Sequence, residues 1–430
     1  MDVEMSTWVR GYWRRFGQTR RGVAQLASGS VIGQLATFLA TPTLTRIYGP
    51  EAFGAANYIV AISAIATVVG TLSLEQAIQI ASDEEATNRL IQLATLSIVG
   101  VSLLLIVSSY FFPTILLGGQ VEPVVGHSIA LGAITTATGL SVVLSQALLR
   151  WREFGMLSRR AIVQSTSTAI AQIGLSAFSR SSIGLLSGQL VGRGMNVLAM
   201  LVQARHRRIW QLRGGLGTTF RNSLRFSLGF TLSGLVNALG LQLPVLLATS
   251  WFGLEIGGQA GMAYRLALLP LSVLGTSVAQ VFGAELGRRV RTGQLDNVAV
   301  FTRSARQLLA VALPIFVVLV WAAPPLVPLF LGPEWEMAGQ LMQGMAASSA
   351  LGIVASPLGR VFVVYRRADI AVALDISRIV MILVPAYVAF EAGWAALPVV
   401  WLMFLGQALN YSASWLCGYL LVRSQRHRSE

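Results

Sequence analysis

The chain has 430 residues, of which 54% are hydrophobic and 12% are charged. Soluble domains usually carry about 25% charged residues, so water is excluded as the main solvent of this fold. The single cysteine excludes an intrachain disulfide and hence a disulfide-rich secreted scaffold. The formal net charge of +14 is compatible with a nucleic-acid or a membrane partner, and the placement of the basic residues decides between them.

The first 22 residues are polar and rich in Arg, without the apolar core and cleavage site of a signal peptide. Apolar side chains recur there at helical spacing, with Arg residues among and after them: Trp8, Val9, Tyr12, Trp13 and Phe16. This pattern predicts an amphipathic segment over 1–22 that lies in the interface of the cytoplasmic leaflet.

Charge-free runs of about 20 residues, the length that crosses a bilayer, recur along the rest of the chain. They predict an all-α, polytopic membrane protein of about twelve transmembrane helices. The first six spans are expected near 24–46, 53–77, 90–117, 125–149, 159–178 and 183–204. The last six are expected near 224–250, 257–283, 304–331, 337–364, 369–390 and 395–422.

The basic residues are distributed unevenly between the two sides of this arrangement. When the chain is threaded through the predicted spans, one set of connections holds only Arg46 and Arg180, while the other set and both chain ends are rich in Arg. Short cytoplasmic loops retain positive charge, so both termini are predicted to be cytoplasmic. The net charge therefore indicates a membrane topology, and no nucleic-acid partner is expected.

The two halves of the chain share landmarks. Tyr48-Gly49-Pro50-Glu51 before the second span is matched by Phe252-Gly253-Leu254-Glu255 before the eighth. Transporters built from repeats related by an axis along the membrane normal show such internal similarity. We therefore expect two pseudo-symmetric six-helix lobes. The predicted units are an N-lobe over 23–204, a basic cytoplasmic linker over 205–223, a C-lobe over 224–422 and a cytoplasmic tail over 423–430.

The most specific motif reads Leu44-Thr45-Arg46-Ile47-Tyr48-Gly49-Pro50-Glu51-Ala52-Phe53-Gly54, and Leu74-Glu75-Gln76-Ala77-Ile78 and Asp83-Glu84-Glu85 follow it. These residues resemble the Wzx-type polysaccharide flippases of the multidrug/oligosaccharidyl-lipid/polysaccharide (MOP) exporter superfamily. The resemblance implies a MATE-like, two-lobed bundle in the bacterial cytoplasmic membrane. It implies export of a polyprenyl-diphosphate-linked oligosaccharide by alternating access, for O-antigen, capsule or exopolysaccharide. No cofactor is expected. Membrane lipids are expected partners, with a polysaccharide polymerase or chain-length regulator as a further candidate.

Four Arg residues lie inside predicted spans: Arg193, Arg265, Arg360 and Arg378. Each would cost about 2.5–3.5 kcal/mol if it faced lipid, so these side chains should face protein or water. A guanidinium matches phosphate oxygens, which predicts that they bind the diphosphate, with Arg265 favoured. The alternatives are hydrogen bonds to a neighbouring helix for Arg193, snorkelling for Arg360 and an ion pair with Asp375 for Arg378.

Other polar side chains within spans extend this hypothesis. Asp375 is a candidate for coupling transport to a proton or cation, and its ion pair with Arg378 is the alternative. The expected cavity lining consists of Gln34, Thr37, Asn237 and Gln242, whose alternative role is packing between helices. No metal-ligand spacing occurs in the sequence, and neither a metal nor enzyme chemistry is predicted.

There are two rival functions, of which the second belongs to another class. A cation-coupled multidrug exporter of the same superfamily should have a more acidic, aromatic cavity. A membrane-embedded polysaccharide polymerase should carry a large outer loop with clustered catalytic residues, and the predicted connections are short. The four intramembrane Arg residues disfavour the drug exporter, and the short connections disfavour the polymerase.

Overall fold

The structure is a computed structural model that describes residues 28–116, 119–121, 125–151, 153–207, 209, 215–292, 294 and 297–427. These residues are helical apart from short connections, and no strand occurs among them, so the all-α prediction is confirmed. The amphipathic segment predicted over 1–22 lies outside the described residues, as does the end of the predicted tail.

The first six predicted spans are all helical. Residues 28–47 form the first helix, and the others are α2 (Pro50–Thr71) continued by α3 (Leu74–Ile80), α4 (Glu84–Phe111), α6 (Val125–Arg150), α7 (Phe154–Leu175) and α8 (Ser182–Ala204). Short turns at α5 (Pro113–Leu116) and η1 (Arg205–Arg207) lie between or after them. The break between α2 and α3 falls at Leu72 and Ser73, which adopt left-handed φ values of 49° and 48°.

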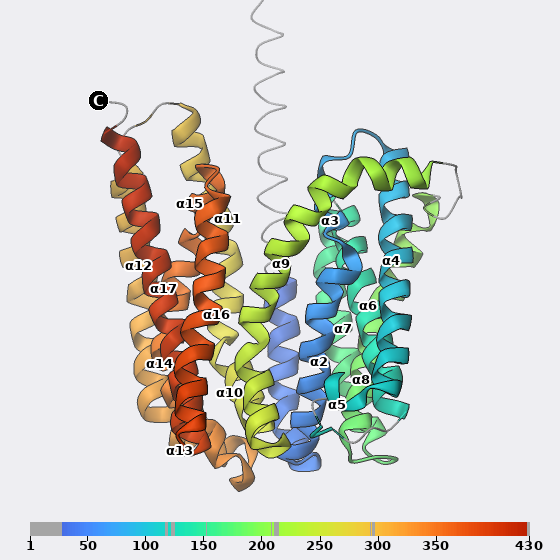
Figure 1. Ribbon diagram of the computed structural model, residues 1–430, viewed down its shortest axis with the longest axis vertical. Coiled ribbons are helices and arrows are strands. Elements are labelled where there is room, and N and C mark those ends of the chain that lie inside the picture. Colours follow the sequence, from blue (N-terminus) through green and yellow to red (C-terminus); the bar gives the residue numbers. More distant parts are fainter. Residues whose placement is uncertain are drawn as a thin grey trace, which may run out of the picture.

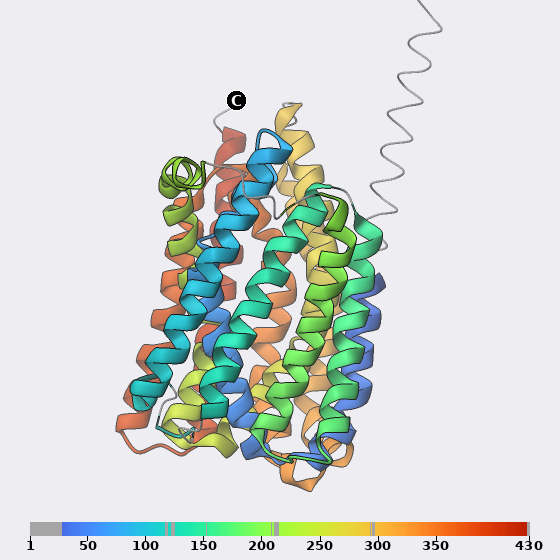
Figure 2. The ribbon, with the colours of Figure 1, turned by 90° about the vertical axis from the view of Figure 1, so that its right-hand side faces the viewer.

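The last six predicted spans are helical as well, and three of them are interrupted. The uninterrupted spans are α9 (Leu216–Phe252), α16 (Ala368–Glu391) and α17 (Ala396–His427). The eighth span consists of α10 (Leu254–Ala267) and α11 (Leu269–Arg291), and the ninth of α12 (Asn297–Val317), a π-helical turn (Val318–Ala322) and α13 (Ala323–Leu331). The tenth consists of η3 (Pro333–Trp335), α14 (Glu336–Leu358) and α15 (Arg360–Val364). Figures 1 and 2 show that the helices run along the long axis in two lobes.

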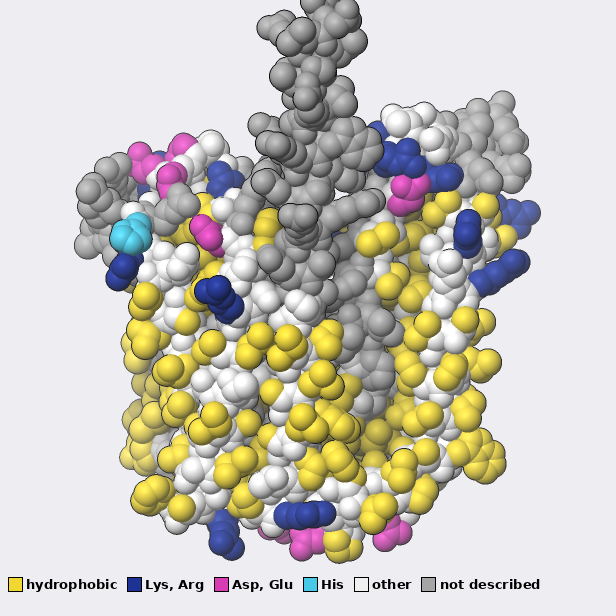
Figure 3. Space-filling model, turned by 180° about the vertical axis from the view of Figure 1, so that it is seen from behind, with side chains coloured by type: hydrophobic (Ala, Val, Ile, Leu, Met, Phe, Trp, Pro, Cys, Tyr) yellow, Lys and Arg dark blue, Asp and Glu magenta, His cyan; other side chains and the backbone are white. Residues whose placement is uncertain are grey.

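The outer surface is suited to a lipid environment. Nine of the described helices are long and apolar enough to cross a membrane. Large apolar side chains such as Leu103, Leu313 and Val384 are exposed. In Figure 3 hydrophobic side chains cover the middle of the visible face, and charged side chains gather at its two ends. Because a bilayer core solvates apolar groups and not charges, this belt indicates a membrane-spanning bundle.

The lobes meet through α2 and α10 at the end of the molecule opposite the C-terminus (Figure 1). Gly54 and Gly258 lie backbone to backbone, since a Cβ at Gly54 would be 1.8 Å from the Leu254 carbonyl oxygen and one at Gly258 would be 1.9 Å from that of Pro50. These two glycines are separated by the same spacing as the matched residues Glu51 and Glu255. The contact therefore joins equivalent positions of the two halves.

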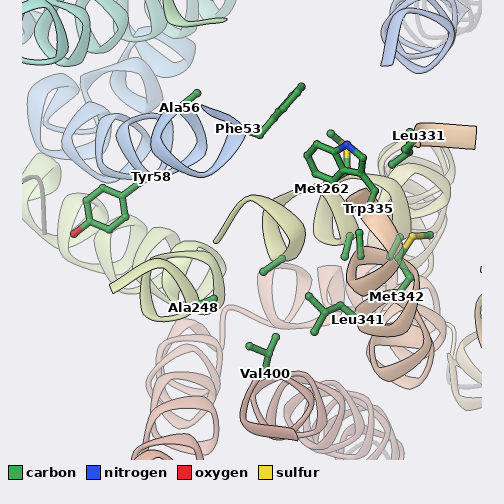
Figure 4. Close-up of a cluster of buried hydrophobic side chains, with 14 of the residues drawn as sticks. Phe53, Ala56, Tyr58, Ala248, Met262, Leu331, Trp335, Leu341, Met342 and Val400 are labelled. Atoms are coloured by element: carbon green, nitrogen blue, oxygen red, sulfur yellow. The ribbon is translucent and has the colours of Figure 1, made fainter. Parts of the chain in front are cut away.

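Apolar and polar contacts surround this glycine pair and together form the inter-lobe seam. Phe53 packs edge-on against Trp335 with ring centroids 5.3 Å apart, and the cluster continues through Met262 and Leu341 (Figure 4). The Thr45 hydroxyl donates to the Leu331 carbonyl at 2.8 Å. The first helix thus contacts the C-lobe here, although its other end packs on α7.

Helix α9 also packs on both lobes. Its early part packs on α2, α3 and α4, where Ser227 donates to the Leu72 carbonyl oxygen. Its end packs on α16, with Trp251 stacked on Phe390 at 4.7 Å. The helix begins at Leu216, inside the stretch expected to be a linker. Figure 1 shows it crossing the molecule diagonally.

Candidate functional site

A polar cavity of about 320 Å³ lies between α6, α7 and α8 of the N-lobe, within the usual size of small-molecule pockets. We name it the arginine pocket. Its lining contains hydroxyl, amide and guanidinium groups and no carboxylate, and consists of Thr138, Ser141, Val142, Ser145, Gln146, Arg160, Gln164 and Arg193. Such a lining offers two positive charges together with hydroxyl and amide groups that can form hydrogen bonds.

The α6 wall of the arginine pocket follows from helical spacing. Thr138, Ser141 and Ser145 recur three and four positions apart and therefore share one face. Each hydroxyl donates one turn back along its own helix, Thr138 to the Ile134 carbonyl at 2.6 Å and Ser141 to that of Ala137 at 2.7 Å. With their protons used in this way, the hydroxyl oxygens can accept hydrogen bonds from the arginines.

Arg193 of α8 is one of the predicted site residues that reaches this pocket. Its Nη1 donates to the Thr138 hydroxyl, and its Nη2 donates to Oε1 of Gln189 at 3.3 Å. The adjacent Gly192 brings α8 against α7, because a Cβ there would lie 2.8 Å from the Thr168 backbone nitrogen. Arg193 therefore both bonds to a neighbouring helix, as the predicted alternative has it, and lies on the wall of the cavity.

Arg160 is a site residue that sequence reasoning missed. Arg160 lies at the start of the predicted span 159–178 and is not among the four Arg residues singled out there, yet in α7 it lines the arginine pocket and donates from Nη1 to the Ser145 hydroxyl. Gln164 follows it by one turn and lines the same wall. That spacing, which puts two polar side chains on one helix face, was the signal available in the sequence.

Arg265 lies in the last turn of α10, where the helix dipole favours a cation. Its Nη2 donates across the lobe boundary to Oδ1 of Asn57 on α2 at 3.4 Å. Gly261, one turn earlier, makes room for Asn57, since a Cβ there would be 2.3 Å from the Asn57 Nδ2.

Arg378 and Asp375 form a separate cluster in the C-lobe. Arg378 of α16 is buried and donates from Nη2 to Asp375 Oδ1 and to Asn237 Oδ1, both at 2.9 Å. The guanidinium lies over Gly240 of α9, where a Cβ would be 2.5 Å from its Nε. The ion pair that was the alternative interpretation of both charged residues is therefore present, and Asn237 is engaged in it.

The remaining predicted site residues are dispersed. Arg360 is exposed at the start of α15 beside Gly283, as snorkelling would require. Thr37 on the first helix donates to its own helix at the Gly33 carbonyl. Gln34 and Gln242 are half-buried on the first helix and α9. None of these four residues lines the arginine pocket.

Two half-buried positive charges that form no ion pair among the described residues line the arginine pocket. In the part of the chain that the structure describes, the ion pairs of Arg involve Arg89, Arg288, Arg289, Arg367 and Arg378. Arg160, Arg193 and Arg265 are half-buried and make hydrogen bonds only to neutral groups. This arrangement can bind an anion and disfavours a cation.

Sequence comparisons relate the chain to proteins of polysaccharide biosynthesis. Residues 43–339 match the family described as "Polysaccharide biosynthesis protein". The teichuronic acid biosynthesis protein TuaB of Bacillus subtilis is 24% identical over 46% of this chain and 41% of its own length. The succinoglycan biosynthesis transport protein ExoT of Rhizobium meliloti is 23% identical over 73% of this chain and 63% of its own length. The matches thus span less than two thirds of either relative.

Solved structures show the same fold. A point mutant of a MATE protein superposes with a TM-score of 0.61 at 15% identity, covering 94% of this chain and 96% of the other. An inward-facing MATE transporter of the MOP superfamily gives a TM-score of 0.63 at 16% identity, with 94% of each chain covered. A Pyrococcus furiosus MOP transporter, described as having a binding pocket of reverse polarity, gives 0.61 at 15% identity over 95% and 96%.

Together these matches confirm the two-lobed MOP fold and the Wzx-type resemblance. The chain is accordingly a multi-pass protein of the bacterial cytoplasmic membrane. The structural neighbours are transporters and one curated relative is a transport protein, which agrees with the prediction of a transporter rather than an enzyme.

Proposed function

The chain belongs to the polysaccharide biosynthesis protein family, and from that premise we propose that it is an exporter that moves a polyprenyl-diphosphate-linked oligosaccharide from the cytoplasmic to the outer leaflet. The observation that supports this cargo is the group of three half-buried arginines, Arg160, Arg193 and Arg265, that have no carboxylate partner among the described residues.

The energetic argument concerns uncompensated charge. A guanidinium that faced lipid in the middle of a span would carry an insertion cost of about 2.5–3.5 kcal/mol, and Arg160 and Arg193, which line the same pocket, also repel each other. A carboxylate would remove this cost most simply, as it does for Arg378. A transported anion removes it only while bound, which stabilises the loaded state relative to the empty one. Phosphate oxygens match the planar fork of a guanidinium.

The rival function, a cation-coupled drug exporter, has weaker support. Its coupling site would need an available carboxylate within a span; Asp375 is ion-paired with Arg378, and Glu75 of α3 lies outside the arginine pocket. The arginine pocket contains no acidic side chain. Its fixed positive charge would repel a cationic drug.

Deletion of the gene tests the proposal. Lipid-linked oligosaccharide should accumulate on the cytoplasmic leaflet, where it stays protected from agents added outside spheroplasts. Complementation with Arg265→Ala should not restore export, whereas Arg306→Ala, which removes an exposed Arg from α12, should restore it at equal protein level. An unchanged pool of lipid-linked intermediates after deletion would refute the proposal.

A further inference from the structure

We propose that the arginine pocket is a diphosphate-binding site built within the N-lobe alone, with Arg160 and Arg193 as its two clamps. This inference rests on the proposed function and names the place where the cargo's anionic group is held. The two guanidinium groups come from neighbouring helices, α7 and α8, and both are anchored to α6. The wall between them consists of hydroxyl and amide side chains.

The two anchors are far apart along one helix. Arg193 is anchored at Thr138 and Arg160 at Ser145, two turns apart on one face of α6. Seven residues at 1.5 Å rise separate these anchors by about 10 Å along the helix axis. A diphosphate carries oxygens on two phosphorus atoms, so each guanidinium can bind a phosphate group of its own, which a single phosphate does not provide.

Gln164, which lines the pocket together with the two clamps, adds a hydrogen-bond donor. Asn196 of α8 donates from Nδ2 to Gln164 Oε1 at 2.9 Å and to the Ser141 hydroxyl at 3.2 Å. Because the carbonyl oxygen of Gln164 accepts that bond, the NH₂ group is what Gln164 can present to a ligand. The pocket thus combines two cations with a neutral donor, a set that suits an extended anion.

Placement within one lobe has a mechanistic result. The clamps lie on α7 and α8 and their anchors on α6, so all belong to the N-lobe, whereas Arg265 approaches from the C-lobe through Asn57. When lobes rock against each other, a diphosphate held by Arg160 and Arg193 moves with the N-lobe. Arg265 then adds its charge only in conformations that bring α10 near.

The test uses the full-length protein in nanodiscs of zwitterionic lipid, with inorganic pyrophosphate and orthophosphate as probes and thermal unfolding as the readout. Pyrophosphate should raise the Tm of the wild type, and orthophosphate at equal ionic strength should raise it less. Arg160→Gln and Arg193→Gln should weaken pyrophosphate binding at least about tenfold, the loss of one hydrogen bond to a charged group. Arg306→Gln is the matched control and should bind normally.

A second arm identifies the source of the diphosphate. Nanodiscs containing polyprenyl diphosphate are compared with nanodiscs containing the polyprenol, and a Tm rise that Arg160→Gln abolishes assigns the pocket to a lipid headgroup. A response to pyrophosphate alone assigns it to a free anion. If Arg193→Gln does not fold, Arg193→Lys replaces it, because Lys keeps the charge and loses the planar fork.

The proposal would be overturned if Arg160→Gln bound both probes like the wild type, if orthophosphate matched pyrophosphate, or if no probe bound. Its failure is distinguishable from failure of the proposed function. If Arg265→Ala abolishes export while Arg160→Gln exports normally and binds pyrophosphate like the wild type, the arginine pocket does not hold the cargo. The proposal that the protein is a flippase then still stands. If deletion of the gene leaves the pool of lipid-linked oligosaccharide unchanged, the proposed flippase function is refuted.

Discussion

Arg378 donates to Asp375 one turn earlier on α16, at 2.9 Å, with 6% and 25% of the two side chains exposed. Removing one partner of such a buried pair leaves an unpaired charge, at a cost of about 3 kcal/mol. Asp375→Asn should therefore lower the Tm clearly. Export per folded molecule should persist, because the carboxylate is committed to Arg378. Reduced export at an unchanged Tm would instead identify Asp375 as a coupling residue.

A double substitution separates structure from coupling at this pair. Asp375→Leu combined with Arg378→Leu removes both charges, and buried pairs replaced by apolar residues are often neutral in stability. The double variant should thus be more stable than Arg378→Leu alone. Equal Tm values for the two would show that the pair does not contribute as a unit.

The Gly54–Gly258 contact predicts a conformational effect of the smallest side chain. Gly54→Ala places a Cβ 1.8 Å from the Leu254 carbonyl oxygen, and such overpacking costs about 1–3 kcal/mol. The cost applies only while the lobes touch at this seam, so the equilibrium should shift by about 30-fold, for about 2 kcal/mol, toward an open seam.

A reporter cysteine measures that shift. Ala56→Cys in a Cys417→Ser background is buried in the same cluster, and its reaction with a membrane-impermeant maleimide should accelerate when Gly54→Ala is added. Gly100→Ala, at a glycine with no atom near its Cβ position, is the control and should leave the rate unchanged. Equal rates in all three proteins would contradict the role of the seam.

The hydrogen bond from Thr45 to the Leu331 carbonyl predicts a smaller effect in the same direction. Thr45→Val leaves that buried carbonyl unpaired in the closed seam, at a cost of about 1–2 kcal/mol. Thr43→Val changes an exposed neighbour and should be neutral. The Ala56→Cys labelling rate again measures the outcome, and labelling equal to that of Thr43→Val would remove this bond from the seam.

The distribution of Arg predicts the orientation in the membrane. Ser82 and Ser181 are exposed in connections at opposite ends of the bundle, and the first lies on the Arg-rich side. In a Cys417→Ser background, an impermeant maleimide on intact cells should label Ser181→Cys and not Ser82→Cys. Permeabilised cells should show both labelled. The reverse pattern would invert the predicted topology.

The spans were predictable because charge-free runs of bilayer length leave few alternatives. Their ends were less predictable, because some charged residues that were expected in loops lie within the helices. The third span was expected from residue 90, whereas α4 begins at Glu84 because Asp83 caps it, accepting from the Ala86 amide at 2.7 Å. Asp83 is exposed, and this hydrogen bond holds the pKa of its carboxyl below the usual value.

The site was less predictable because hydropathy does not reveal which helix faces meet. Arg193 and Arg265 were identified by depth alone, and Arg160 was missed because it follows Arg159 at a span boundary. The partner of Arg378 could be predicted because it lies on the same helix. The anchoring of Arg160 and Arg193 on α6 depends on tertiary packing, which a single sequence does not specify.

The attachment of α9 to both lobes limits how far they can separate. A Cβ at Gly234 would lie 3.1 Å from Cγ1 of Val68 in the N-lobe, and Gly240 lies against Arg378 of the C-lobe. The helix therefore passes from one lobe to the other within residues 235–239. Opening the molecule further at its C-terminal end must either flex this short stretch or detach Ser227 from Leu72. The flexibility of residues 235–239 therefore limits the width of a cargo that can enter between the lobes.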